Sequence, residues 1–178
     1  MLAPGGQHGP GCIDVHIVVV MGVSGCGKSS VGARLAERLG ATFLDADDFH
    51  PPANVERMRA GIALTDADRV GWLAALASRL ADAAAANESV VLACSALKRS
   101  YRDALRRGAP ALRLVHLTGS PALLAERIAA RTGHYMPPSL LPSQLALLEV
   151  PGADEHALTH DVAPPTDQIV ATLVEQLA

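Results

Sequence analysis

Residues 22–29 read Gly-Val-Ser-Gly-Cys-Gly-Lys-Ser, an octet that fits the pattern G-x-x-x-x-G-K-[ST] at every fixed position. A largely apolar run, residues 15–21, precedes the octet and is typical of a strand buried on both faces of a parallel sheet. Residues 28–39 follow with apolar side chains at helical spacing, and Gly40 is a suitable helix stop. The octet therefore predicts a strand, a tight glycine loop and a helix in immediate succession.

This octet has the chemistry of a phosphate-binding loop. Its glycines let successive backbone N–H groups point at phosphate oxygens, and the next helix adds unpaired donors and the positive end of its dipole. We expect Lys28 to reach the β- and γ-phosphates of ATP and the Ser29 hydroxyl to ligate Mg²⁺. The predicted nucleotide-binding residues are Gly22, Val23, Ser24, Gly25, Cys26, Gly27, Lys28, Ser29 and Ser30.

The rest of the chain alternates strand and helix patterns. Further strands are predicted at 42–44, 89–94, 112–117 and 157–162, and helices at 51–61, from 65 or 66 onward, 101–107, 121–131 and 169–177. In the helix that begins near residue 65, an apolar stripe is predicted along Val70, Leu73, Leu76 and Leu80. The alternation indicates an α/β fold of three layers, with helices on both faces of a parallel five-stranded sheet. We expect residues 1–13 to form a flexible tail and residues 14–178 one domain, with a lid at about 127–156.

An acidic cluster follows the second predicted strand. Asp45 and Asp47 stand where a parallel strand ends, which is where open α/β sheets bind their ligands. We expect Asp45 to help hold Mg²⁺ and Asp47 to orient and deprotonate an acceptor hydroxyl. Asp48 is the better candidate for a helix cap.

Two arginines precede the loop-rich part of the predicted lid. Arg127 and Arg131 are four residues apart and project from one helix face. A lid that carries arginines to a transferring phosphate needs this geometry, so both are candidate catalytic residues. An ordinary solvated helix face is the alternative.

Charge and cysteine content exclude several classes of protein. The net charge of −3 argues against a nucleic-acid partner, and the short apolar run before the loop cannot span a bilayer. Three cysteines, Cys12, Cys26 and Cys94, are at spacings of neither a disulfide framework nor a zinc site, which favours a cytoplasmic location. The sequence leaves open whether the protein forms a homodimer.

Several longer motifs resemble one family, the bacterial gluconokinases. They are GVSGCGKS, FLDADDFHPPANVERM, GIALTDADRVGWL, CSALKRSYRDALR, RTGHYM and EVPGADE, and together they span about residues 15–175 in the family's order. The resemblance implies phosphoryl transfer from ATP to the 6-hydroxyl of D-gluconate, on a five-stranded P-loop kinase fold with a lid. It also places Asp45 and Asp47 like the Asp-x-Asp pair of the related shikimate kinases.

An acceptor such as gluconate needs a cation for its carboxylate and hydrogen-bonding side chains for its hydroxyls. Arg57, Lys98 and Arg102 are candidates for the first task, and Asp47 and His50 for the second. Two other functions stay open at this point. One is a shikimate-kinase-like enzyme for another small polyhydroxy acid, and the other is a non-catalytic nucleotide-binding module.

Overall fold

The computed structural model describes residues 15–131 and 138–178, and a five-stranded parallel sheet forms its centre. The strand order is β2-β3-β1-β4-β5, which places β1, the strand before the glycine loop, in the middle. The strands are β1 (Ile17–Met21), β2 (Thr42–Asp45), β3 (Val90–Ala93), β4 (Arg113–Thr118) and β5 (Leu158–Asp161). Every strand predicted from the sequence is present.

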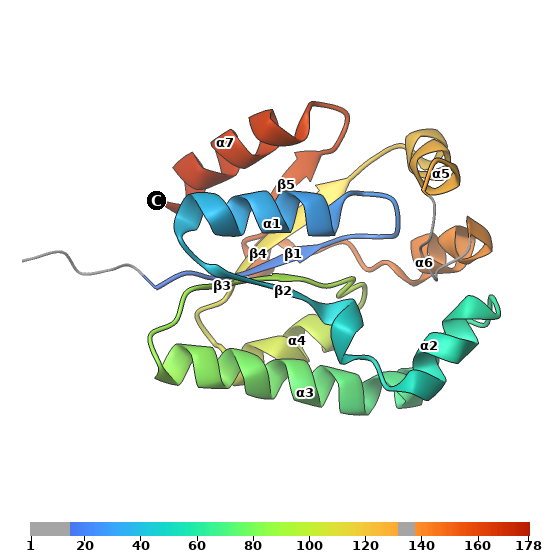
Figure 1. Ribbon diagram of the computed structural model, residues 1–178, viewed down its shortest axis with the longest axis horizontal. Helices are drawn as coiled ribbons and strands as arrows, with labels where there is room; N and C mark the ends of the chain where they lie inside the picture. The colour runs from blue at the N-terminus through green and yellow to red at the C-terminus, as the bar shows by residue number, and fades with distance from the viewer. Residues whose placement is uncertain (1–14, 132–137) are drawn as a thin grey trace, which may run out of the picture.

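Helices cover both faces of this sheet (Figure 1). In Figure 1, α1 and α7 lie on one face, and α3 and α4 lie on the other. The helices are α1 (Lys28–Leu39), α2 (Pro52–Arg59), α3 (Asp66–Ala85), α4 (Arg99–Gly108), α5 (Pro121–Ala129), α6 (Leu141–Leu147) and α7 (Thr166–Leu177). Short 3-10 helices occur at η1 (Ala46–Phe49), η2 (Pro138–Leu140) and η3 (Ala153–Glu155).

The alternation of side chains along β1 builds the two halves of the core. Val18 and Val20 pack in the apolar cluster that contains residues of α1 and α7. Val19 and Met21 point the other way and pack with α3 and α4. Because both faces of β1 are covered, the strand is apolar throughout, as expected for the centre of a parallel sheet.

One predicted core position is wrong. Leu73, Leu76 and Leu80 of α3 are buried, but Val70 is 65% exposed. Val70 lies in the first two turns of α3, where the helix extends past the sheet toward α2 (Figure 1). A helical stripe reports only which side faces inward, and the sheet is too short to cover all of it.

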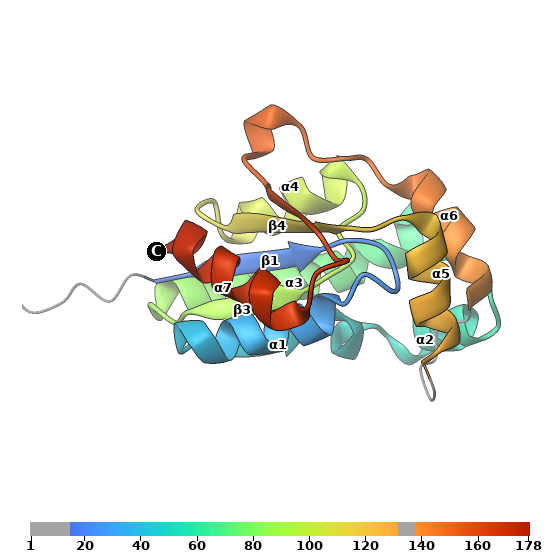
Figure 2. The same cartoon turned by 90° about the horizontal axis from the view of Figure 1, so that it is seen from above.

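Helices α2, α5 and α6 gather beyond the carboxyl ends of the strands, as both views show (Figures 1 and 2). The predicted lid, 127–156, falls partly here, but its residues 132–137 lie outside the described part of the chain, as does the predicted tail at 1–13. Residues near its end are held to the segment between β3 and α4: Glu149 N–H donates to the Leu97 carbonyl at 2.8 Å. In the described ranges no helix is both long and apolar enough to cross a membrane.

Candidate active site

The glycine loop joins β1 to α1 and curls around its own lysine. Gly25 and Gly27 adopt φ of 84° and 83°, a region that side chains other than glycine rarely enter. A Cβ atom on Gly25 would lie 2.8 Å from the carbonyl oxygen of Leu124, so α5 leaves no room for a side chain. The Lys28 ammonium donates to the carbonyl of Val23 at 3.1 Å, which holds it against the inner side of the loop.

Cys26 has its side chain turned into the protein. It is 1% exposed, and a Cβ atom on Gly22 would lie 2.7 Å from its sulfur. Gly22, Val23 and Cys26 therefore shape the loop from within and offer a ligand only their backbone. Ser30, also predicted to bind nucleotide, is exposed in the first turn of α1.

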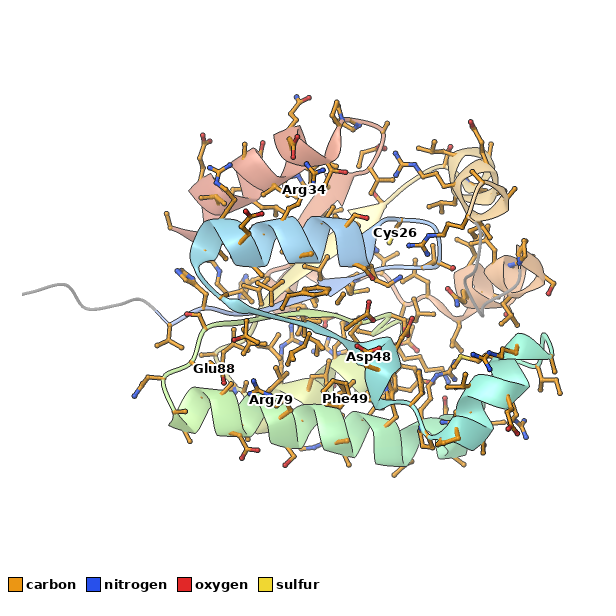
Figure 3. All side chains as sticks on the ribbon, viewed as in Figure 1. Cys26, Arg34, Asp48, Phe49, Arg79 and Glu88 are labelled. Atoms are coloured by element: carbon orange, nitrogen blue, oxygen red, sulfur yellow. The ribbon has the colours of Figure 1, made fainter. Side chains whose placement is uncertain are left out.

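The start of α1 meets the end of β2 at two side chains whose oxygen atoms are suited to bind a metal ion. The Ser29 hydroxyl donates to Asp45 Oδ2 at 2.6 Å, and Asp45 Oδ1 accepts the Asp47 N–H at 3.0 Å. Hydroxyl and carboxylate oxygens are the ligands that Mg²⁺ prefers. Asp48, labelled in Figure 3, is exposed in the same turn. The structure thus brings together the two predicted metal ligands.

A cleft joins these groups to the helical end of the molecule. Its phosphate side is formed by the glycine loop, Asp45, Asp47 and Arg131, and its floor by residues 93–95 and Leu97 after β3. The opposite wall is formed by the chain from the end of η1 into α3, and its residues are His50, Met58, Leu64, Arg69 and Trp72. One cleft therefore offers a phosphate site and an acceptor wall.

A histidine and a tryptophan form the flat part of that wall. The rings of His50 and Trp72 stack at 4.3 Å with an angle of 11° between their planes. Trp72 Nε1 donates to the Ala46 carbonyl at 2.7 Å, which fixes the indole. Burial, helped by the charge of Arg69, lowers the pKa of His50 to about 4, so the imidazole is neutral at physiological pH. Its Nδ1 is buried and has no hydrogen-bond partner within residues 15–131 and 138–178.

The three cations predicted to bind the acceptor carboxylate lie elsewhere. Arg57 is 3.7 Å from Asp68, and Lys98 is 2.8 Å from Asp66. Neither lines the cleft among the described residues. Both were candidates because an acceptor carboxylate needs a cation, but the sequence could not show that acidic neighbours already pair with them.

Arg102 is the clearest correction. Its side chain is 1% exposed, its Nε and Nη2 donate to the Glu155 carboxylate at 2.6 and 2.7 Å, and its Nη1 donates to the carbonyls of Ala96 and Leu97, both at 3.1 Å. A guanidinium so engaged is not available to a substrate. Arg102 instead ties η3 to the loop after β3, whose Ala96 has a φ of 43°.

The two predicted lid arginines are separated. Arg131, just after α5, lines the cleft. Arg127 donates to the carbonyl of Val162 at 2.7 Å, on the side of β5, and is absent from the cleft lining in the described ranges. The motif RTGHYM begins at Arg131, and its remainder lies outside the described residues.

Several cleft residues were missed from the sequence, among them Arg69, Trp72 and Gln144. Gln144 of α6 accepts the Ser24 N–H at 2.7 Å, which joins α6 to the glycine loop. Arg69 and Trp72 are three residues apart on α3 and so share a helix face. In the sequence, Arg69 stands three residues before the only tryptophan of the chain, and this spacing was the one sign that both belong to the site.

The glycine loop before a helix, the parallel sheet and the Asp45–Ser29 pair define a P-loop kinase. A family model described as an AAA domain matches residues 17–151. The chain is 50% identical over 159 residues to the gluconokinase of Gluconobacter oxydans (strain 621H), with 89% of each chain covered.

Two solved structures are also close. A gluconokinase from Sinorhizobium meliloti 1021 is 50% identical with a TM-score of 0.79, covering 91% of this chain and 95% of that one. An unliganded sugar kinase from Janibacter sp. HTCC2649 is 43% identical with a TM-score of 0.88, covering 92% and 96%. The chain belongs to the gluconokinase family, and the predicted family and fold class are confirmed.

Proposed function

We propose that the chain transfers the γ-phosphoryl group of ATP to the 6-hydroxyl of D-gluconate, giving ADP and 6-phospho-D-gluconate. The observation that carries this proposal is the 50% identity with a gluconokinase over 89% of both chains, joined to a cleft that contains both a phosphate loop and a polar acceptor wall. A cytoplasmic location, where ATP is made available, is part of the proposal.

On the nucleotide side, the glycine loop and Lys28 would hold the phosphates. Ser29 and Asp45 would hold Mg²⁺, because their oxygens already lie 2.6 Å apart at the mouth of the loop. When bound, Mg²⁺ would neutralise part of the negative charge of the phosphates. Arg131 lines the cleft together with the glycine loop. We therefore assign to it the stabilisation of the negative charge that develops on the phosphoryl group during transfer.

On the acceptor side, Asp47 would place the 6-hydroxyl in line with the γ-phosphorus and take its proton. The bond from the γ-phosphorus to the bridging oxygen breaks with its electrons going to ADP, and the new bond forms to the hydroxyl oxygen of gluconate. His50 lines the cleft, and its neutral imidazole can hydrogen-bond a substrate hydroxyl through a ring nitrogen. Positioning dominates in a loose transition state, and a general base adds about 10²- to 10⁴-fold.

A shikimate-kinase-like activity on another polyhydroxy acid is the alternative that shares this cleft. The test is ADP release measured with gluconate, other sugar acids and shikimate as acceptors. We expect turnover that depends on gluconate and exceeds that with shikimate. Equal release without any acceptor would indicate a simple ATPase, and no release with any acceptor would indicate a non-catalytic nucleotide-binding module; either result would refute the proposal.

The roles of the two aspartates can be separated in the same assay. Asp47→Asn should lower kcat by about 10²- to 10⁴-fold with little change in the Mg²⁺ requirement. Asp45→Asn should raise the Mg²⁺ requirement, because it removes the carboxylate bonded to Ser29. The reverse pattern in a Mg²⁺ titration would exchange the two assignments.

A further inference from the structure

Arg69 reaches the acceptor wall from the first turn of α3. Its Nη1 donates to the carbonyls of Leu64 at 2.5 Å and Thr65 at 3.4 Å, and lies 3.4 Å from the Tyr101 hydroxyl. Its guanidinium carbon is 5.5 Å from the centre of the Tyr101 ring, an attractive cation–π distance. One nitrogen of the guanidinium thus fixes the side chain.

The remaining donors of Arg69 are not used within the described ranges. Its Nε and Nη2 make no hydrogen bond there, and no carboxylate of those residues lies within 4.0 Å of it. The nearby aspartates are paired with other cations, Asp66 with Lys98 and Asp68 with Arg57. Both aspartates also feel the charge of Arg69, which helps to lower their pKa values, but within the described residues Arg69 forms no direct ion pair and keeps two N–H groups for a ligand.

Arg69 lies where it can contact the end of an acceptor molecule that is remote from the reacting hydroxyl. Lys28, Arg131 and Arg69 are the cations that line the cleft in the described part of the chain. The first belongs to the phosphate loop and the second adjoins it, whereas Arg69 shares its wall with His50. Its charge helps to keep that imidazole neutral. An acceptor whose reacting hydroxyl faces Asp47 would thus present its other end to Arg69.

We propose that Arg69 binds the carboxylate of the sugar acid and is the residue that makes the cleft prefer an acid to a neutral polyol. The inference rests on the proposed function, since gluconate carries its carboxylate at C1 and its acceptor hydroxyl at C6, at opposite ends of the chain. Nε and Nη2 present two N–H groups side by side, the fork that matches a carboxylate. Arg69 is a specificity-determining residue and takes no part in the bond-making step.

The charge of the substrate provides the test. Gluconate is compared with gluconamide, which keeps every hydroxyl but replaces the carboxylate by a neutral amide. A charge-assisted contact is worth about 1.5–3 kcal/mol, so wild-type kcat/KM should favour gluconate by about 10- to 150-fold. Arg69→Gln should lose that preference by lowering kcat/KM for gluconate alone, with the KM for ATP unchanged. Arg69→Lys should retain part of the preference.

The matched control is Arg59→Gln, a cation on neighbouring α2 that is exposed, is outside the cleft lining and forms no ion pair within the described residues. This variant should keep the wild-type preference. An equal loss toward both substrates in Arg69→Gln would show that Arg69 acts only by bracing Leu64 and Thr65, and would overturn the inference. So would a wild-type enzyme that uses gluconate and gluconamide equally well. A wild type inactive on gluconate and its amide would overturn the proposed function along with it.

Discussion

Replacing Glu155 with glutamine should strongly destabilise the chain, because it removes the charge from one half of a buried ion pair. The Glu155 side chain is 2% exposed. Its carboxylate accepts from Nε and Nη2 of Arg102 at 2.6 and 2.7 Å, from Arg106 at 3.0 Å and from the Gly152 N–H at 3.1 Å. The pair joins η3 to α4 and, through Arg102, to the floor of the cleft.

The size of the effect follows from the carboxyl group itself. Hydrogen bonds from Arg102 lower the pKa of Glu155 from its ordinary value of 4.5 to about 2, against the opposing effect of burial. That shift corresponds to on the order of 3 kcal/mol of stability, close to the roughly 3–5 kcal/mol expected for breaking a buried pair. Because the folded pKa is depressed, this stability is present above pH 4.5 and is lost as the pH falls through 2.

Urea unfolding at two pH values tests the prediction. The gap between wild type and Glu155→Gln should be about 3 kcal/mol at pH 7 and about 2 kcal/mol at pH 3.5. The control is Asp154→Asn, on the same η3, whose exposed carboxylate pairs with Arg99; it should change stability little at either pH. A gap for Glu155→Gln that does not change with pH would refute the reasoning.

Three further predictions concern the loop, the lid and the helix packing. Lys28→Ala should lower kcat by about 10³-fold or more with the unfolding transition unchanged, and normal ADP release from the folded variant would refute the P-loop mechanism. Arg131→Ala should reduce kcat more than Arg127→Ala in the same assay, because only the former side chain lines the cleft; an equal or inverted loss would reverse that assignment. Gly108→Ala should destabilise the chain by about 1–3 kcal/mol in urea unfolding, since its Cβ would lie 2.1 Å from the Ala77 carbonyl oxygen and force α4 from α3; wild-type stability would show that α4 adapts freely.

Local signals predicted the parts of the site that depend on the chain's own sequence neighbours. The glycine octet fixed where the phosphate loop lies, because a strand, a turn with positive φ and a helix must follow one another there. Asp45 was found because strand ends in a parallel sheet meet at one edge, and it does lie 2.6 Å from Ser29. These inferences needed no knowledge of side-chain packing.

The acceptor wall could not be predicted in the same way. Whether an arginine is available to a ligand depends on which acids lie beside it in space, and a helical pattern does not give those partners. Arg102 was a candidate for the acceptor carboxylate, yet it is buried and paired with Glu155, which is far along the chain. Arg69 looked ordinary, yet its acidic neighbours form their ion pairs with Lys98 and Arg57, and Arg69 lines the cleft without a direct ion pair among the described residues.

The measurement that tests the account most directly is phosphorus NMR of the product formed from ATP and D-gluconate. Transfer to the primary 6-hydroxyl predicts a new phosphate ester signal split into a triplet by the CH₂ group of C6, formed together with an equal amount of ADP. Lys28→Ala should produce none of it. A doublet would place the phosphate on a secondary hydroxyl, and an unsplit inorganic phosphate signal would show hydrolysis without transfer; either result would contradict the proposed function.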